Sequence, residues 1–231
     1  MLSILIPTYN YSIFQLVQNM HQQCIAGSIV FEIICLDDHS TVDFYIENQK
    51  INELANCFYF KNESNLGRTR TRQILAEKAK FDWVLFLDAD VIPEKETFIK
   101  QYISNLNDSH TVVFGGYKYE KIQPEPSKIL RYKYGKEREE QSAEFRSKKP
   151  YQFVFSGNML INKNLFLDLN YTEKEKFYGM DIYFAYQLFS NKITVLHLDN
   201  AIFHHGLESN DDFFEKSLRS VKWELNNSIH F

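Results

Sequence analysis

Short apolar runs alternate with amphipathic stretches through the first half of the chain. Four runs have the length and composition of strands that are covered on both faces: residues 2–6, 31–36, 57–60 and 83–87. The segments between them carry apolar residues at helical spacing, and helices are expected around residues 13–20, 44–54 and 68–80. This alternation predicts an α/β fold with a mostly parallel central sheet and right-handed crossovers.

Ser12 and Gln15 predict a capping box at the start of the first helix.

The pattern of apolar and polar residues is less regular after Pro93. In the second half, the expected elements are a helix at 94–106, a strand at 111–117, a helix flanked by mobile loops within 118–150, two short strands around 156–158, a helix from Asp181, strands near 194–198 and 201–206, and a helix at 211–223. The chain has no internal repeat and no low-complexity segment.

Polar residues follow three of the first four predicted strands. These are the loops at residues 8–10, 37–38 and 88–90. The strands of a parallel sheet point the same way, so polar loops that are far apart in sequence are expected to gather on one edge and form one pocket.

The loop after the fourth run contains two carboxylates, Asp88 and Asp90, with one residue between them. Two such acids at a strand end can project toward one divalent cation, which prefers oxygen ligands. The alternative is that they merely solvate the strand end or cap a following helix. The polar loops on either side favour the metal interpretation.

Composition excludes several classes of protein. The chain has 231 residues, 44% of them hydrophobic, and a net charge of −4, so no overall basic field attracts nucleic acid. Cys24, Cys35 and Cys57 show no C-x-x-C spacing and are interpreted as reduced thiols. Pro7 follows the first apolar run too soon for a signal helix, and no run of 18 apolar residues exists. A cytoplasmic protein is therefore expected.

A basic cluster lies within residues 118–150 and is interleaved with glutamates. Its members are Arg131, Lys133, Lys136, Arg138, Arg146, Lys148 and Lys149. The simpler interpretation is a solvated helix face; the alternative is a contact for an anionic acceptor or a lipid head group.

Taken together, the motifs resemble glycosyltransferase family 2, the inverting nucleotide-sugar transferases of the GT-A fold. The matching segments, in the family's order, are residues 6–10, 36–40, 65–72, 87–90, 155–158 and 178–181, followed by His204. One departure is Met180 before Asp181, where the family often has Glu-Asp. The resemblance implies a single GT-A domain over 1–231, with a nucleotide-sugar half at 1–117 and a smaller acceptor and catalytic-base half at 118–231.

The resemblance also implies roles for particular residues. Asp181 would be the general base. The nucleotide-sugar site would comprise Pro7, Thr8, Tyr9, Asp38, Arg68, Asp88 and Ala89, with Tyr9 stacked on uracil, Asp38 accepting from the uracil N3–H and Asp88 on the ribose. The acceptor side would comprise Gly157, Asn158, Gly179 and Met180. Mn²⁺ or Mg²⁺ would be held by Asp90 and His204, with Asp88 reaching the cation through water.

Several of these residues have simpler interpretations. Tyr9 could be a core aromatic, Asp181 an acid favoured by a helix dipole, and His204 a strand-end histidine that competes with His205 for the metal. Arg68 could pair with uracil or with a phosphate. Of the neighbouring candidates, Asp37 is expected to matter less than Asp38, and Arg70 and Arg72 are expected to be surface groups.

The implied activity is transfer of a hexosyl or N-acetylhexosaminyl group from a UDP-sugar to a glycan or lipid-linked saccharide, in cell-surface polysaccharide or lipopolysaccharide synthesis. No nucleic-acid partner is expected, and peripheral contact with the inner face of the membrane would suit a lipid-linked acceptor. The alternatives are a non-catalytic, metal-dependent nucleotide-sugar-binding domain and a nucleotidyltransferase. A nucleotidyltransferase would need a Gly-rich basic loop after the first strand to hold a triphosphate. This chain has Pro7, Thr8, Tyr9 and Asn10 there instead.

Overall fold

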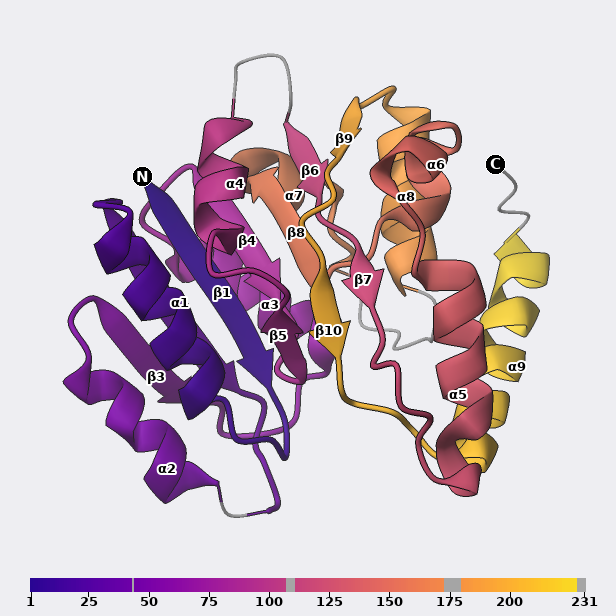
Figure 1. The fold of residues 1–231 in the computed structure, drawn as a ribbon, viewed down its shortest axis with the longest axis horizontal. Coiled ribbons are helices and arrows are strands. Elements are labelled where there is room, and N and C mark those ends of the chain that lie inside the picture. Colours follow the sequence, from indigo (N-terminus) through magenta and orange to yellow (C-terminus); the bar gives the residue numbers. More distant parts are fainter. Residues whose placement is uncertain (43, 107–110, 173–179, 228–231) are drawn as a thin grey trace.

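The structure is a computed structural model that describes all residues except 43, 107–110, 173–179 and 228–231; for residues 223–227 only the backbone is described. The described chain forms two sheets with helices around them (Figure 1). None of the helices in these ranges is both long and apolar enough to cross a membrane.

The larger sheet has seven strands in the order β3-β2-β1-β4-β8-β6-β9. Their bounds are β1 (Leu2–Thr8), β2 (Phe31–Asp37), β3 (Cys57–Lys61), β4 (Trp83–Leu87), β6 (Val112–Phe114), β8 (Asn158–Asn162) and β9 (Val195–His197). Strands β1 to β4 pair in parallel, as predicted, and only β8 runs against its neighbours β4 and β6. The expected mostly parallel α/β sheet is confirmed.

A smaller sheet of three strands, in the order β5-β10-β7, lies beside the first. It comprises β5 (Val91–Pro93), β7 (Tyr117–Lys118) and β10 (Ile202–His204). The predicted single strand at 111–117 was wrong: it divides between the sheets at Gly115 and Gly116. Gly116 has φ +94°, which a side chain would strain, and a Cβ at Gly115 would collide with the Asn200 carbonyl. The two glycines therefore allow the chain to pass from one sheet to the other.

Helices lie around the two sheets (Figure 1). They are α1 (Phe14–Ala26), α2 (Tyr45–Gln49), α3 (Arg68–Lys78), α4 (Phe98–Ser104), α5 (Ile129–Tyr134), α6 (Ala143–Ser147), α7 (Lys163–Leu169), α8 (Met180–Ser190) and α9 (Asn210–Asn227), with shorter helical turns η1 (Lys50–Glu53), η2 (Pro126–Lys128), η3 (Gly135–Glu139) and η4 (Pro150–Phe153). The segment 118–150 is thus more helical than expected. The first of the two strands expected around 156–158 is also wrong, because η4 precedes β8 there.

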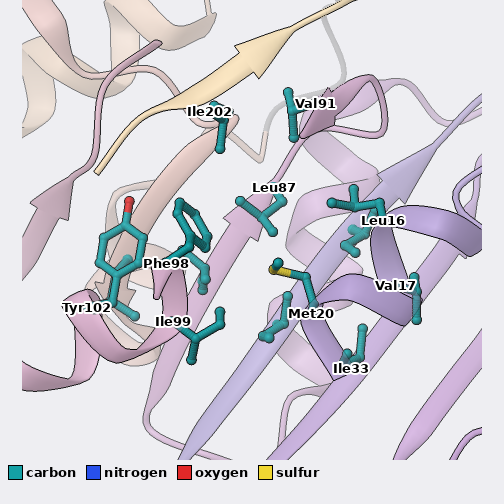
Figure 2. Packing of buried hydrophobic residues seen from close by; sticks show 14 of the residues in the cluster. Leu16, Val17, Met20, Ile33, Leu87, Val91, Phe98, Ile99, Tyr102 and Ile202 are labelled. Carbon is teal, nitrogen blue, oxygen red and sulfur yellow. The ribbon is translucent and has the colours of Figure 1, made fainter. Parts of the chain in front are cut away.

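Two hydrophobic clusters divide along the alternation of β4. Leu85 and Leu87 pack in one cluster with α1 and α4, whereas Val84 and Phe86 pack in the other with α3, α7 and α8. Figure 2 shows the first cluster, in which the Leu87 side chain of β4 lies between Phe98 of α4 and Leu16 of α1. Burial on both faces explains why this strand is an unbroken apolar run.

The predicted capping box at the first helix is wrong. The N-cap position is Ile13, which has no side-chain hydrogen bond to the helix. Ser12 donates instead to Glu47 at 2.7 Å, and the Ile13 amide donates to Asn48 at 2.9 Å. The start of α1 is therefore tied to α2, and this tertiary contact replaces the local cap.

Candidate active site

A cavity of about 760 Å³ lies at the edge where β1 and β4 end. Most of the residues singled out from the sequence line it: Pro7, Thr8, Tyr9, Asp38, Arg68, Asp88, Ala89, Asp90, Met180, Asp181 and His204. The parallel register of β1 and β4, with Leu5 opposite Phe86, carries both strand ends to this edge. Loops separated by about eighty residues in the sequence thus share one cavity.

Two predicted acceptor-side residues, Gly157 and Asn158, do not line the cavity. Asn158 is fully buried, and its amide donates to the carbonyls of Gly116 (2.8 Å) and Asn200 (3.1 Å), so it holds the two sheets together. Gly157 lies against Asp88, whose carboxylate occupies the space that a Cβ would take. Gly179 lies outside the described residues, as does Tyr178.

Tyr9 and Asp38, the two residues predicted to contact the nucleotide base, both line the cavity. The Tyr9 side chain is 48% exposed, so it is not a core aromatic. Asp38 is 5% exposed and accepts hydrogen bonds from the amides of Leu66 (2.8 Å) and Gly67 (2.7 Å) and from Asn62 (3.0 Å). A carboxylate offers about four lone-pair sites, so Asp38 can still accept one more donor.

Asp88 forms an ion pair with Arg72 that sequence reasoning missed. Arg72 is 4% exposed, so the prediction that it is a surface group was wrong; burial lowers its pKa, against the opposing effect of Asp88. The signal was the spacing of four residues between Arg68 and Arg72, which places both on one face of α3. Arg70, on another face, is exposed and pairs with Glu77 at 3.6 Å, as expected of a surface group.

Asp90, in the turn just before β5, lies close to His204 on the neighbouring strand β10. His204 lies opposite Val91, and its Nε2 is 3.4 Å from Asp90 Oδ2. Burial raises the pKa of Asp90, but the His204 hydrogen bond and charge outweigh it and hold that pKa below its usual value. His205 turns the other way, with its Nε2 4.0 Å from Glu120, as strand alternation requires.

This pair fits the divalent cation that the sequence implies. The separation of 3.4 Å suits two ligands on one cation, since metal–ligand bonds are about 2.0–2.2 Å long. The Asp90 carboxylate fills the space that a Cβ on Gly206 would need. Within the described residues no group of three His, Cys, Asp or Glu side chains could hold a metal. A cation here would need further ligands besides Asp90 and His204.

Asp181 lies in the first turn of α8 and faces the same cavity. Its carboxylate accepts from the Ser156 amide at 3.2 Å and lies 3.4 Å from the Arg68 guanidinium. Burial raises the pKa of Asp181, but Arg68, Arg72 and the Ser156 hydrogen bonds together lower it below its usual value. The side chain is thus held as a carboxylate, the form that can accept a proton.

Tyr117 is a further cavity residue without a sequence signal. Its ring packs 5.6 Å from Phe155 and 5.8 Å from His204. Burial, followed by the charges of Asp88 and Asp181, raises the pKa of its phenol well above the usual value. The phenol therefore stays protonated. It can act as a hydrogen-bond donor in the part of the cavity between Asp181 and the candidate metal ligands Asp90 and His204.

Comparison with known sequences identifies one family and one curated relative. The sequence profile of Glycosyl transferase family 2 matches residues 3–169. An uncharacterized glycosyltransferase of Haemophilus influenzae is 34% identical over 107 residues, which are 45% of this chain and 34% of the relative. The chain thus spans about a third of the length of that relative.

Solved structures share the fold. TarS of S. aureus (residues 1–349) in complex with UDP-GlcNAc is 22% identical, with a TM-score of 0.63, 93% of this chain covered and 64% of the other. Glucosyl-3-phosphoglycerate synthase of Mycobacterium tuberculosis, in complex with Mn²⁺, UDP and phosphoglyceric acid, is 16% identical, with a TM-score of 0.65 and coverage of 95% and 75%. The mannosyltransferase PcManGT of Pyrobaculum calidifontis, in complex with GDP-Man and Mn²⁺, is 12% identical, with a TM-score of 0.62 and coverage of 88% and 56%.

Proposed function

The chain belongs to glycosyl transferase family 2 and has the GT-A fold, and from this premise we propose that it is an inverting glycosyltransferase that moves a sugar from a UDP-sugar to a hydroxyl of a glycan or lipid-linked acceptor. One observation carries the proposal. The candidate nucleotide residues Tyr9 and Asp38, the acids Asp88 and Asp90 and the candidate base Asp181 all line a single cavity.

The donor would lie along the edge of the large sheet. Tyr9 offers an exposed ring on which uracil can stack, and Asp38 keeps a lone pair for the uracil N3–H. Arg68 faces the cavity and can neutralise phosphate charge. Complexes of the fold relatives with UDP and UDP-GlcNAc support a uridine nucleotide and a hexosyl or N-acetylhexosaminyl group.

Asp90 and His204 would hold Mn²⁺ or Mg²⁺, with Asp88 reaching the cation through water. When bound, such a cation acts as a Lewis acid toward the diphosphate of the leaving nucleotide. The Mn²⁺ complexes of two fold relatives support this choice, and the mixed histidine and carboxylate pair favours Mn²⁺ over Mg²⁺.

Asp181 would be the general base of the transfer. Its lowered pKa keeps it as a carboxylate at neutral pH, and the Ser156 amide fixes one of its oxygens. It would accept the proton of the acceptor hydroxyl as that oxygen attacks the anomeric carbon from the face opposite the UDP group. The C–O bond to UDP breaks as the new one forms, so the configuration at that carbon inverts. Help of this kind is worth roughly 10²–10⁴-fold in rate.

A panel of nucleotide sugars tests the choice of nucleotide base, the need for a metal ion and the choice of sugar in one experiment. Thermal shift is measured with UDP-, GDP- and TDP-sugars, each with and without Mn²⁺, and hits are then assayed for UDP release with saccharide acceptors. We expect stabilisation by one UDP-sugar that requires the cation, followed by acceptor-dependent UDP release. Metal-dependent binding with no release under any acceptor would instead favour the non-catalytic binding domain.

The proposed setting is synthesis of a cell-surface polysaccharide or lipopolysaccharide from the cytoplasmic side, with peripheral contact to the membrane if the acceptor is lipid-linked. This part of the proposal is supported by the class of enzyme. Fractionation of the native host tests this membrane contact. We expect part of the protein to be recovered in a salt-extractable membrane fraction.

A further inference from the structure

One wall of the cavity has no part in the donor site proposed above. It is formed by α5, η3 and the segment around the start of α9; α5 and α9 lie side by side next to the smaller sheet (Figure 1). We call it the α5–α9 wall and define it by the cavity residues Arg131, Tyr134, Glu139, Glu208, Phe213 and Ser217.

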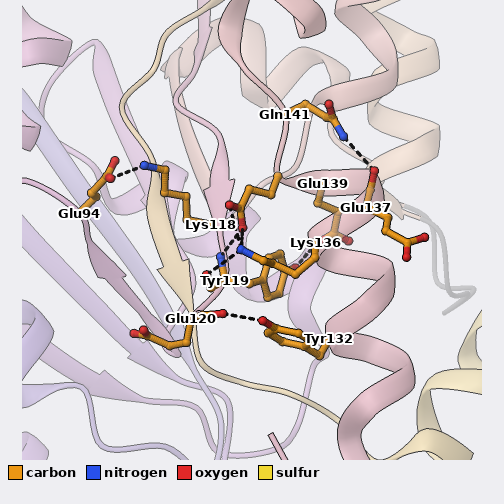
Figure 3. Close-up of polar contacts among 10 residues, drawn as sticks. Glu94, Lys118, Tyr119, Glu120, Tyr132, Lys136, Glu137, Glu139 and Gln141 are labelled. Carbon is orange, nitrogen blue, oxygen red and sulfur yellow. Dashed lines mark hydrogen bonds and ion pairs between the residues drawn. The ribbon is translucent and has the colours of Figure 1, made fainter. Parts of the chain in front are cut away.

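A wide helical turn fixes part of this wall. Residues 135–139 form a π-helical turn, and such turns are frequent at functional sites. Only glycine fits at position 135, because the Tyr119 ring occupies the space that a Cβ would need. The Tyr119 hydroxyl then donates to Glu139 Oε2, as Figure 3 shows. Glu139 is thereby held in one position at the cavity wall.

The charges of the α5–α9 wall are compensated within the protein. Arg131 donates to Glu139 Oε2 at 3.0 Å, and its guanidinium lies 5.5 Å from the ring centres of both Tyr119 and Phe213. Glu208 forms an ion pair with Lys216. Of the other members of the basic cluster, Lys136 pairs with Glu140, Lys148 pairs with Glu144 and Arg146 is buried. The remaining members are exposed but do not line the cavity: Lys133, Arg138 and Lys149. Among its described residues, the wall thus offers no uncompensated cation to a phosphate or carboxylate.

The same wall keeps unused hydrogen-bonding capacity of both kinds. Within the described residues, two buried atoms of its ion pairs have no hydrogen-bond partner: the donor Arg131 Nη1 and the acceptor Glu208 Oε2. Both hydrogen bonds to Glu139 fall on Oε2, and in the described chain Oε1 accepts none. Hydroxyl groups both donate and accept, so they match this set, whereas an anion would face the Glu139 and Glu208 carboxylates.

An aromatic pair completes the wall. Tyr134 is 47% exposed and lies 5.3 Å from Phe213, ring centre to ring centre. The C–H face of a sugar ring packs well on such a surface while its hydroxyls reach polar groups at the edge. Apolar contact beside compensated polar groups is the chemistry of a carbohydrate subsite.

From these contacts we propose that the α5–α9 wall is the acceptor subsite and that it takes an uncharged saccharide in preference to an acceptor bearing phosphate or carboxylate. The proposal rests on the proposed function and names the acceptor class of the same cavity. Tyr134 and Phe213 stack on the sugar ring, and Glu139 receives one of its hydroxyls. Arg131 positions Glu139, and its own charge is already balanced.

The test is saturation-transfer-difference NMR on the full chain. The neutral probes are the methyl β-glycosides of glucose, galactose and N-acetylglucosamine, and the anionic probes are glycerol 3-phosphate and 3-phosphoglycerate, each measured with and without UDP and Mg²⁺. We expect saturation of at least one neutral glycoside and of neither anion. Binding of an anion in preference to all three glycosides, or binding of no probe, would overturn the proposal.

Variants separate a subsite from a merely structural role. Tyr134→Ala should weaken glycoside binding about tenfold, whereas Phe58→Ala should not, because it removes a similarly exposed ring on the edge strand β3, outside the cavity. Glu139→Gln leaves the Arg131 charge uncompensated, so the variant should gain affinity for 3-phosphoglycerate. Loss of packing alone cannot produce that gain, and its absence would count against the proposal.

UDP affinity, measured by calorimetry on the same samples, distinguishes the two proposals. Unchanged UDP binding in all three variants is expected, because none of these residues belongs to the donor site. Failure of the wild-type chain to bind any UDP-sugar would refute the proposed function, whereas UDP-sugar binding without glycoside binding would refute only the acceptor subsite.

Discussion

The guanidinium of Arg68 lies 3.4 Å from the carboxylate of Asp181, and this pair joins two helices that are 112 residues apart at their starts, α3 at 68 and α8 at 180. The Arg68 guanidinium, together with Arg72 and the Ser156 amide, keeps Asp181, the candidate base, in its ionised form.

Replacement of Arg68 by Gln should move the acid limb of the pH–rate profile to higher pH. Asp181 has a lowered pKa in the folded protein, so it is deprotonated at neutral pH and loses its base form only as the pH falls. Removal of the nearby cation raises that pKa, and protonation then begins at higher pH. Arg70→Gln, on the same helix but paired with Glu77, is the matched control and should leave the limb in place.

Asp181→Asn should abolish most of the transfer while UDP-sugar binding survives. The amide keeps the shape of the side chain but cannot accept the acceptor proton, so turnover should fall roughly 10²–10⁴-fold. Single-turnover kinetics and calorimetry of UDP binding measure the two effects separately. Turnover near that of the wild type would exclude Asp181 as the base.

Asp90→Ala and His204→Ala should each weaken Mn²⁺-dependent UDP binding by more than about tenfold, since even outer-shell partners of a metal are worth that much. Chelation of the metal should bring the wild type to the same affinity. His205→Ala is the control, because His205 faces Glu120 and not Asp90. Equal losses in the two histidine variants would contradict the assignment of His204.

Arg72→Met should destabilise the protein by roughly 3 kcal/mol, because it leaves the Asp88 carboxylate partly buried without its partner. Urea unfolding measures the change, and Arg70→Met should shift stability by no more than about 0.5 kcal/mol. If the ion pair is the cause, adding Asp88→Asn to Arg72→Met should recover part of the loss. Simple additivity of the two changes would argue that the pair does not interact.

Stability should fall below pH 6.5 because of His197. Burial, with Arg146 adding to it, lowers the pKa of this histidine from 6.5 to about 4 despite its hydrogen bond to Pro150. The unfolded chain binds the proton first, so stability is full above pH 6.5 and decreases by up to about 3 kcal/mol as the pH falls to 4.

The side-chain contacts of His197 supply the control. Its Nε2 faces the Pro150 carbonyl at 2.9 Å, and Nδ1 accepts from Arg146 at 3.3 Å. His197→Gln can keep both hydrogen bonds and has no proton to gain, so its stability should vary less between pH 6.5 and 4. NMR titration of His197 checks the pKa, and a value near 6.5 would contradict the expectation.

Local sequence patterns were sufficient for much of the fold and the cavity. The apolar run at 83–87 identified a strand that is buried on both faces, and the rule that parallel strands share an edge brought Tyr9, Asp38 and Asp90 to one cavity. These inferences needed only periodicity and chain direction.

Features that depend on distant pairing could not be obtained in this way. The burial of Arg72 depends on Asp88, the cap of α1 was replaced by Asn48, and the break at Gly115 depends on a second sheet. Half of the α5–α9 wall likewise comes from the segment 118–150, whose mixed charges resemble a solvated surface, and it meets its other half only at residues 208–217. In each case a partner far along the chain decides the outcome.

The place of β8 has a consequence for how the chain is made. Residues 158–162 complete the large sheet between β4 and β6, so a nascent chain that ends near residue 117 leaves both of those strands without their shared neighbour. Unpaired strand edges invite association with other chains, and such long-range pairing slows folding. The first half should therefore need either protection on the ribosome or the arrival of the second half before it becomes safe from aggregation.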